Sequence, residues 1–269
     1  MLRIRAALRA NIERTGGFSR EPALAFDLSQ SWITHTTQPA AGRSAAVLSP
    51  QAFADAFVRR AAAIEARHEA QTTGTVAALR RKYAEPILGR VSPWSLVEKL
   101  AQCIDPTDQR LWGASQQLHV LQIIDAMEAE GTATEEWLLV ALVHDLGKVL
   151  LLTGEAPENV VCMNRPVSVC EPGGDLDNCV FQWNHDEFAY SRLKEYLPDG
   201  LAWLVRYHSI LPAACEPYMD ARDRAWYERY LRPFSRYDHE TKSPLNLPQR
   251  RIEDYRYIVE RALPGSIPF

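Results

Sequence analysis

Apolar positions recur every three or four residues from about residue 50 onward, which is the spacing of one face of an α-helix. The pattern predicts helices beginning at Ser49-Pro50 and at Ser92-Pro93, where a capping serine precedes a first-turn proline. Thr132-x-x-Glu135 predicts a capping box for a helix that continues to residue 152. Further helices are predicted over residues 175–196, 201–210, 222–236 and 252–263.

Alternating strand patterns are scarce, and the best short candidates are Val160-Val161 and residues 167–169. Residues 15–50 are rich in Gly, Ser, Thr, Pro and Ala, which predicts an irregular arm. We therefore expect an all-α fold. Its predicted organisation is an N-terminal arm and helix over residues 1–74, followed by a helical domain over residues 75–269.

Composition and charge narrow the function classes. The 269 residues are 46% apolar and 24% charged, which is typical of a globular protein, and the net charge is −4. This charge gives no field for wrapping a nucleic acid. No apolar run reaches the ~18 residues that a membrane span needs. We expect a small-molecule substrate, no nucleic-acid or membrane partner, and a monomer or small homo-oligomer.

Two features bear on the cellular compartment. The first twenty residues hold five arginines and one glutamate, which fits either an organelle transit peptide or a surface helix. The five cysteines form an odd set without a C-x-x-C pair. This pattern predicts neither a disulfide framework nor a structural zinc site, and it favours a cytoplasmic location.

The central chemical feature is His144-Asp145, which lies within an almost continuous apolar stretch. A charged carboxylate is costly to bury without compensation, and a metal cation supplies that compensation. An aspartate has two oxygens and can bridge two cations, whereas the neighbouring imidazole binds one. The dipeptide therefore indicates a site with one or two metal ions.

Four further residues in apolar helical contexts extend this site: His119, His185, His208 and Asp238. Any one buried histidine is usually an ordinary core residue, so it is the set that argues for metal. Six ligands are too many for one tetrahedral zinc, and mixed imidazole and carboxylate ligation suits two iron ions better. Asp186 and Glu187 after His185 could also be ligands, but a side chain one position further along a helix points away, so we expect them to orient their neighbours. We expect His35, His68 and His239 to be solvated or to lie beside the ligands.

The order of these residues resembles the HD-domain superfamily. The surrounding segments are similar to the myo-inositol oxygenase family, over about residues 75–264. They are His-Asp-Leu-Gly-Lys-Val-Leu at 144–150, Leu-Asp-Asn-Cys-Val-Phe-Gln-Trp-Asn-His-Asp-Glu-Phe at 176–188, Arg-Tyr-His-Ser at 206–209 and Tyr-Asp-His-Glu-Thr-Lys at 237–242.

The resemblance implies an HD-domain-like helical bundle around a mixed-valent Fe(II)/Fe(III) pair, with dioxygen as co-substrate. The expected reaction is a four-electron oxidation that cleaves a C–C bond of a polyol, cyclitol or related hydroxylated molecule and gives an acid. One iron is then held by His119, His144 and Asp238. The other is held by His185 and His208, and Asp145 bridges them.

The resemblance also assigns substrate-side roles. Lys148 is expected to act in catalysis with Asp145 and to contact substrate oxygens. The alternative for Lys148 is a charge that complements a helix C-terminus. Other matching substrate positions are Asp105, Thr107, Asp108, Ser209 and Lys242.

One loop departs from the family pattern. Where the family has Gly-Asp-Thr-Phe-Pro, this chain has Cys162-Met163-Asn164-Arg165-Pro166. Met163 removes a carboxylate that accepts substrate hydroxyls in the family. Arg165 adds a donor that we include among the expected substrate contacts, and the alternative is that its side chain points outward. The segment that follows is also shortened, to residues 170–175. These changes predict a pocket of different shape.

Two other function classes stay open at this point. A metal-dependent HD-domain phosphohydrolase acting on a nucleotide or phosphomonoester needs basic side chains to hold phosphate. Lys148, Arg165, Arg206 and Lys242 are available for that role. A helical scaffold without catalytic activity is the third class, and the complete ligand set argues against it.

Overall fold

The computed structural model describes residues 50–269, and helices account for most of the regular structure in that range. The predicted all-α fold class is confirmed. The predicted arm and the arginine-rich start lie outside the described residues. The α-helices are α2 (Pro50–Glu69), α3 (Thr73–Lys82), α4 (Pro93–Lys99), α5 (Gln116–Ala129), α6 (Glu135–Val143), α7 (His185–Leu193), α8 (Asp199–Tyr207), α9 (Pro212–Cys215), α10 (Ala221–Trp226), α11 (Arg232–Glu240) and α12 (Arg256–Ala262).

Shorter elements connect these helices. The 3₁₀ turns are η1 (Leu146–Thr153), η2 (Pro157–Asn159), η3 (Leu176–Asn178), η4 (Glu216–Tyr218) and η6 (Ile252–Tyr255), and η5 (Tyr227–Leu231) is a π-helical turn. The strands β1 (Arg90–Val91) and β2 (Ile267–Pro268) pair antiparallel, which ties the C-terminus to the start of α4. Within residues 50–269, no helix is both long and apolar enough to cross a membrane.

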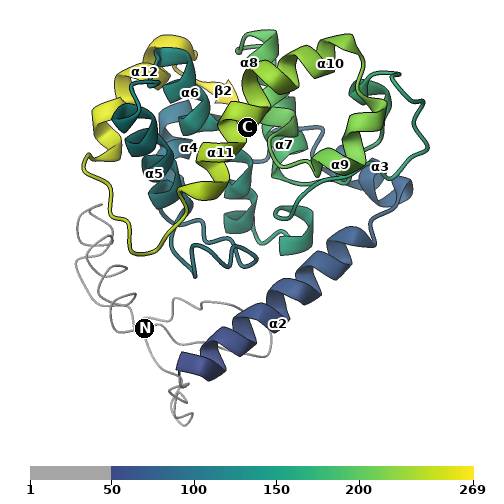
Figure 1. Ribbon diagram of the computed structural model, residues 1–269, viewed down its shortest axis with the longest axis horizontal. Helices are drawn as coiled ribbons and strands as arrows, with labels where there is room; N and C mark the ends of the chain where they lie inside the picture. The colour runs from purple at the N-terminus through teal and green to yellow at the C-terminus, as the bar shows by residue number, and fades with distance from the viewer. Residues whose placement is uncertain (1–49) are drawn as a thin grey trace.

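The helices surround one continuous apolar core, with α11 lying between two groups of neighbours (Figure 1). On one side α5, α6 and α12 pack together, and on the other α7, α8 and α10 do so. Long α2 projects from this body, and its C-terminal end packs against η2. The arrangement brings α5, α6, α7, α8 and α11 around one interior point.

The predicted helix over residues 135–152 breaks at the motif that it carries. α6 ends at Val143, His144 and Asp145 follow, and the chain continues as the tighter turn η1. Gly147 lies at this break, where an added Cβ would stand 2.1 Å from the carbonyl oxygen of His185. Only glycine permits so close an approach. The break therefore packs the motif directly against the first turn of α7.

The N-terminal cap of α6 also differs from the prediction. Thr134, not Thr132, is the capping residue, and its side chain accepts a hydrogen bond from the backbone N–H of Trp137. The hydroxyl of Thr132 instead donates to the carbonyl of Met127 at the end of α5. Thr132 therefore belongs to the turn that leaves α5.

The predicted helix over residues 175–196 is also shorter, because α7 begins only at His185. Asn184 caps it, accepting a hydrogen bond from the N–H of Asp186 at 2.8 Å. The residues before Asn184 pair with residues 165–168 in an extended course, with an isolated bridge between Pro166 and Phe181. Neither 160–161 nor 167–169 forms a strand. His185 is therefore the first residue of its helix and not its middle.

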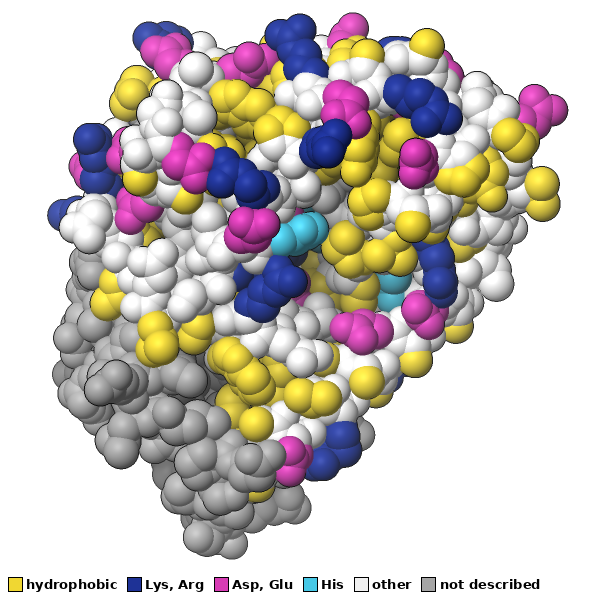
Figure 2. Space-filling model, viewed as in Figure 1, with side chains coloured by type: hydrophobic (Ala, Val, Ile, Leu, Met, Phe, Trp, Pro, Cys, Tyr) yellow, Lys and Arg dark blue, Asp and Glu magenta, His cyan; other side chains and the backbone are white. Residues whose placement is uncertain are grey.

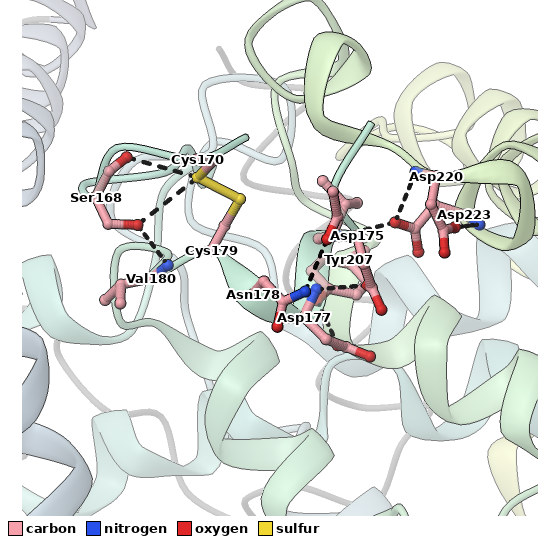
Figure 3. Close-up of a disulfide and its surroundings, with 12 residues drawn as sticks. Ser168, Cys170, Asp175, Asp177, Asn178, Cys179, Val180, Tyr207, Asp220 and Asp223 are labelled. Atoms are coloured by element: carbon pink, nitrogen blue, oxygen red, sulfur yellow. Dashed lines mark hydrogen bonds between the residues drawn. A yellow bond between two sulfur atoms is a disulfide. The ribbon is translucent and has the colours of Figure 1, made fainter. Parts of the chain in front are cut away.

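A disulfide contradicts the expectation from the cysteine pattern. Cys170 and Cys179 are bonded, with their Cα atoms 5.5 Å apart (Figure 3). The extended pairing around Pro166 and Phe181 folds the intervening chain back on itself and brings the two thiols together. The backbone N–H of Val180 also donates to the hydroxyl of Ser168 inside this loop. The two cysteines are nine residues apart, and this spacing alone does not reveal their pairing.

Candidate metal centre

The six predicted ligands gather in the interior, from five helices or their ends. His119 comes from α5, His144 and Asp145 follow α6, and His185 begins α7. His208 follows α8, and Asp238 lies on α11. None of the six is more than 4% exposed. Burying so many ionisable groups together is costly unless they bind something or one another.

The donor atoms form two adjacent groups that share one carboxylate. His119, His144 and Asp145 offer ligand atoms that all lie within 4.8 Å of one another, and so do Asp145, His185 and His208. Oδ2 of Asp145 lies 3.4 Å from Nε2 of His144. Its Oδ1 lies 3.1 Å from Nε2 of His185 and 3.5 Å from Nε2 of His208. Each oxygen of Asp145 thus faces a different group.

Backbone carbonyls orient three of the four imidazoles. Nδ1 of His144 lies 3.0 Å from the carbonyl of Ala141, and Nδ1 of His185 lies 2.7 Å from that of Val160. Nδ1 of His208 lies 3.0 Å from the carbonyl of Val205. Since a carbonyl only accepts, each Nδ1 carries a hydrogen, so that the neutral form of each ring turns the lone pair of Nε2 into the cluster. This is the tautomer that a metal ligand needs.

Several buried polar atoms of the cluster have no hydrogen-bond partner among the described residues. Buried polar atoms without partners are rare in proteins. Those in the cluster are all of a kind that ligates metals, and a cation between them would satisfy them. The residues therefore fit one or two metal ions. The atoms are Nδ1 of His119, Nε2 of His144, Oδ2 of Asp145 and Oδ1 of Asp186.

Neighbouring charges keep the carboxylates ionised. Burial is the largest single influence on Asp145 and raises its pKa, but Lys148, His144 and His185 together outweigh burial and hold this pKa well below its ordinary value. Burial likewise raises the pKa of Asp238, and Lys242 together with nearby histidines lowers it well below its ordinary value. Anionic oxygens at the centre of the site are the state that binds a cation.

The pKa values of two of the imidazoles are shifted in opposite directions from the ordinary value. Burial lowers the pKa of His119 to about 4, and Lys242 adds to this effect. At His208, burial acts the same way, but the carboxylates of Asp186 and Asp145 outweigh it and raise the pKa to about 9. Without a cation, the two carboxylates therefore favour a proton on His208.

The expected substrate-side residues lie beside the same cluster as two lysines paired with two aspartates. Nζ of Lys148 lies 3.1 Å from Oδ2 of Asp145 and 3.3 Å from Oδ2 of Asp105. It also donates to Oε1 of Gln116 at 2.9 Å. Nζ of Lys242 lies 3.2 Å from Asp108 and 3.4 Å from Asp238. The structure thus connects both lysines directly to residues of the metal cluster.

Three other predicted residues divide between the cluster and the surface. The hydroxyl of Thr107 donates to Asp105 at 2.7 Å, and that of Ser209 donates to Oδ2 of Asp186. Arg165 lies apart: its Nη2 pairs with Glu69 at 3.2 Å, and both side chains are exposed. The structure does not bring Arg165 together with the other residues.

His68 is not solvated, which rules out one of the two environments predicted for it. The residue is only 1% exposed, and its Nδ1 lies 2.7 Å from the carbonyl oxygen of Glu158. The available signal was spacing, because Phe57, Ala61, Ile64 and His68 follow one another at helical intervals. The charged residues next to His68 along the chain concealed its buried face.

Asp186 lies against the cluster, with its Oδ1 3.0 Å from Nε2 of His185. This position is compatible with both roles considered for the residue, that of a ligand and that of a group that orients its neighbours. Glu187, by contrast, pairs with Arg206.

The surface differs from the interior in the side chains that it presents. Figure 2 shows acidic and basic side chains interspersed over one face of the molecule, with little histidine visible.

Fold and site together define the class: an all-α, HD-domain-like protein with buried histidine and aspartate groups that could bind metal. Comparison of the sequence with models of known protein families then identifies the family. The model of the myo-inositol oxygenase family matches residues 58–169 and 159–269. The chain belongs to this family, and its assignment as an inositol-oxygenase-like enzyme, an oxidoreductase, is confirmed.

Individual relatives agree with the family match. The chain is 28% identical to a protein described as "Probable inositol oxygenase" from Oryza sativa subsp. japonica, covering 74% of this chain and 77% of the relative. It is 29% identical to "Inositol oxygenase 2" from Arabidopsis thaliana, covering 70% and 71%. It is 25% identical to "Inositol oxygenase" from Bos taurus, covering 73% and 82%.

Proposed function

We propose that this protein is a di-iron oxygenase that uses dioxygen to oxidise a cyclitol or related polyol by four electrons, cleaving a C–C bond to give an acid. The observation that carries the proposal is the buried carboxylate of Asp145, which turns one oxygen toward each of two histidine groups. Relatives that match more than two thirds of the chain are described as inositol oxygenases, which supports this reaction class.

In this proposal His119, His144 and Asp238 hold one iron, His185 and His208 hold the other, and Asp145 bridges them. Imidazole and carboxylate donors with positions left open suit iron. The bound iron pair, in a mixed-valent Fe(II)/Fe(III) state, would supply the redox capacity and Lewis acidity of the reaction. The remaining chemistry falls to the side chains around it.

Lys148 is proposed to bind and polarise a substrate oxygen. Burial opposes its charge, but Asp145 and Asp105 outweigh burial and raise its pKa. Lys148 is therefore a cation that donates hydrogen bonds, and it is not a general base at neutral pH. A hydroxyl held by this ammonium loses its proton more readily, because the positive charge stabilises the alkoxide.

The second lysine and the aspartates complete a surface that alternates donors with acceptors. Lys242 donates, whereas Asp105 and Asp108 accept, and Thr107 and Ser209 can do both. A molecule with several hydroxyls can satisfy such a surface by donating at one position and accepting at the next. We leave Arg165 out of this set because it pairs with Glu69 at the surface.

The loop that departs from the family pattern, residues 162–166, bears on the choice of substrate class. Cys162, where the family has glycine, has a positive φ of 85°, which is uncommon for a residue with a side chain. Burial raises the pKa of its thiol, so the thiol stays neutral. With Met163 in place of an aspartate, this side of the pocket lacks the carboxylate of the family pattern. We therefore propose a cyclitol or polyol, with myo-inositol as the first compound to test.

The test is oxygen uptake by the iron-loaded protein in the presence of ascorbate, with myo-inositol and a panel of other cyclitols and polyols. Phosphate release from nucleotides and phosphomonoesters is measured in parallel. We expect oxygen consumption that depends on one or more polyols, with an acid product and no phosphate release. Phosphate release without polyol-dependent oxygen uptake would contradict the proposal and favour the phosphohydrolase alternative.

A further inference from the structure

Asp186 carries an oxygen that the six-ligand assignment does not use. The residue is fully buried, and its Oδ1 has no hydrogen-bond partner within residues 50–269. This oxygen lies 3.0 Å from Nε2 of His185 and 3.5 Å from Nε2 of His208. Oδ1 of Asp145 stands at almost the same distances from these two nitrogens, 3.1 and 3.5 Å. The two carboxylates therefore relate to the histidine pair in the same way.

Electrostatics shows why this arrangement calls for a cation. His185 and His208 donate the hydrogen of Nδ1 to backbone carbonyls, so the neutral form of each ring presents a lone pair at Nε2. The two Nε2 atoms stand 3.2 Å apart and face carboxylate oxygens. Lone pairs and anionic oxygens repel one another at such distances unless a cation or added protons lie among them.

The spacings also fit a coordination sphere. Donor atoms about 2.1 Å from one metal ion, at angles between 90° and the tetrahedral angle, stand about 3.0–3.4 Å apart. The separations of Oδ1 of Asp186 from the two Nε2 atoms, 3.0 and 3.5 Å, lie in or close to this range. Four protein donors would leave two positions of an octahedral ion open, which is enough for two neighbouring hydroxyls of a substrate.

The other oxygen of Asp186 explains how the side chain is held. Oδ2 accepts a hydrogen bond from the hydroxyl of Ser209 and another, at 3.4 Å, from Nδ2 of Asn164. Asn184, the cap of α7, donates in turn to the hydroxyl of Ser209 at 3.1 Å. These contacts fix Oδ2 on the protein side and leave Oδ1 turned toward the histidines. A carboxylate with one oxygen anchored and the other free suits binding through a single oxygen.

We propose that Asp186 is a seventh protein ligand of the centre and binds the metal ion held by His185 and His208. The inference rests on the proposed function, because it assumes the same two metal positions. Each metal ion then has two histidines and one aspartate of its own, and the two ions share Asp145. The added negative charge at the second position favours the more highly charged state of an iron ion bound there.

The experiment is an iron titration of the full-length protein and its Asp186→Asn variant, with iron per chain measured by elemental analysis after equilibration with a competing chelator. Glu187→Gln is the matched control, because Glu187 is the next carboxylate in the chain and pairs with Arg206 instead. Ser209→Ala tests whether Asp186 acts only by accepting a hydrogen bond. Far-UV circular dichroism checks that each variant is folded.

We expect two iron ions per chain in the unaltered protein and in Glu187→Gln. In Asp186→Asn, we expect about one tightly bound iron, with at least a tenfold weaker affinity at the second position and an altered electron paramagnetic resonance spectrum. Ser209→Ala should keep two. Two tightly bound irons with an unchanged spectrum in folded Asp186→Asn, or equal losses in Asp186→Asn and Ser209→Ala, would overturn the assignment and leave the proposed function standing. Failure of the unaltered protein to bind iron would instead overturn the proposed function itself.

Discussion

Each half of the proposed centre includes a buried carboxylate, Asp238 beside His119 in the first half and Asp186 beside His185 in the second, and these two carboxylates have different contacts. Oδ1 of Asp238 contacts Nε2 of His119 at 2.8 Å and lies 3.4 Å from Nζ of Lys242. Oδ1 of Asp186 has no hydrogen-bond partner among the described residues, although it lies 3.0 Å from Nε2 of His185. Lys242 therefore neutralises part of the charge of Asp238, whereas the charge of Asp186 depends on a cation or on added protons. In the proposed centre, two metal positions with equal numbers of ligands then need not have equal affinity for metal.

The largest effect is expected from the residue that the halves share. Asp145→Asn removes the charge that faces both groups and leaves Lys148 beside a neutral amide. We expect iron content to fall below one ion per chain and polyol-dependent oxygen uptake to fall by at least about a thousandfold. Elemental analysis and oxygen-electrode measurements check this. An active variant with two irons would show that Asp145 does not bridge.

Separate histidine variants should distinguish the halves. His185→Ala is expected to abolish oxygen consumption while leaving the helical circular dichroism signal largely intact, and to retain about one iron in the first half. His119→Ala should retain about one iron in the second half. The spectra of the two residual irons are expected to differ, because their ligand sets differ. Full oxygen uptake by His185→Ala would refute the ligand assignment.

A smaller and different effect is expected at Lys148. Lys148→Met keeps much of the side-chain volume but removes the cation that lies beside Asp145 and Asp105. We expect two irons to remain bound and turnover to fall by roughly 10²–10³-fold, as when an electrostatic contact to the reacting group is lost. Comparing iron content with kcat separates the two roles. Loss of iron in this variant would indicate that Lys148 is needed mainly to hold the site together.

The smallest effect concerns a carboxylate outside both halves, which serves as a reference. Glu155 contacts Lys82 and Tyr83. Burial raises its pKa, but these contacts and others outweigh burial and lower it to about 2. Since the folded-state pKa lies below the ordinary value, the stabilisation is present above about pH 4.5 and is lost as the pH falls toward 2.

We therefore expect Glu155→Gln to lower the free energy of unfolding by about 1–2 kcal/mol at pH 7, after allowance for solvent around the exposed Lys82. The difference should shrink steadily below pH 4.5, as measured by urea unfolding at several pH values. Iron content should not change. A difference that is independent of pH would assign the effect to packing and not to charge.

The gathering of the six residues in one buried cluster could be predicted because each is a histidine or aspartate in an apolar stretch, where burial demands a partner. The position of Asp186 against this cluster does not follow in the same way. Its neighbour His185 was placed in the middle of a long helix, and from that position the next side chain points elsewhere. In the structure, Asn184 caps α7 just before His185, and Ser209 holds Asp186 toward the cluster. Those contacts come from tertiary packing, which periodicity does not encode.

The loop at residues 162–166 is a second feature whose contacts could not be predicted from local spacing. The substitutions at residues 162–166 are visible in the sequence, but their consequences depend on how the chain folds back. Arg165 pairs with Glu69 because α2 lies alongside, and Cys170 meets Cys179 because residues 165–168 pair with residues 180–182. Helices and core positions follow from local spacing, whereas these contacts depend on how the chain folds back on itself.

The central claim is that two iron ions share Asp145 and bind a polyol between them. Electron paramagnetic resonance of the partly oxidised, iron-loaded protein, titrated with myo-inositol and other polyols, tests this claim most directly. The account predicts the signal of a spin-coupled mixed-valent pair that one compound or a related group of compounds perturbs at saturation. A signal from isolated ferric ions only, unchanged by every polyol, would contradict it.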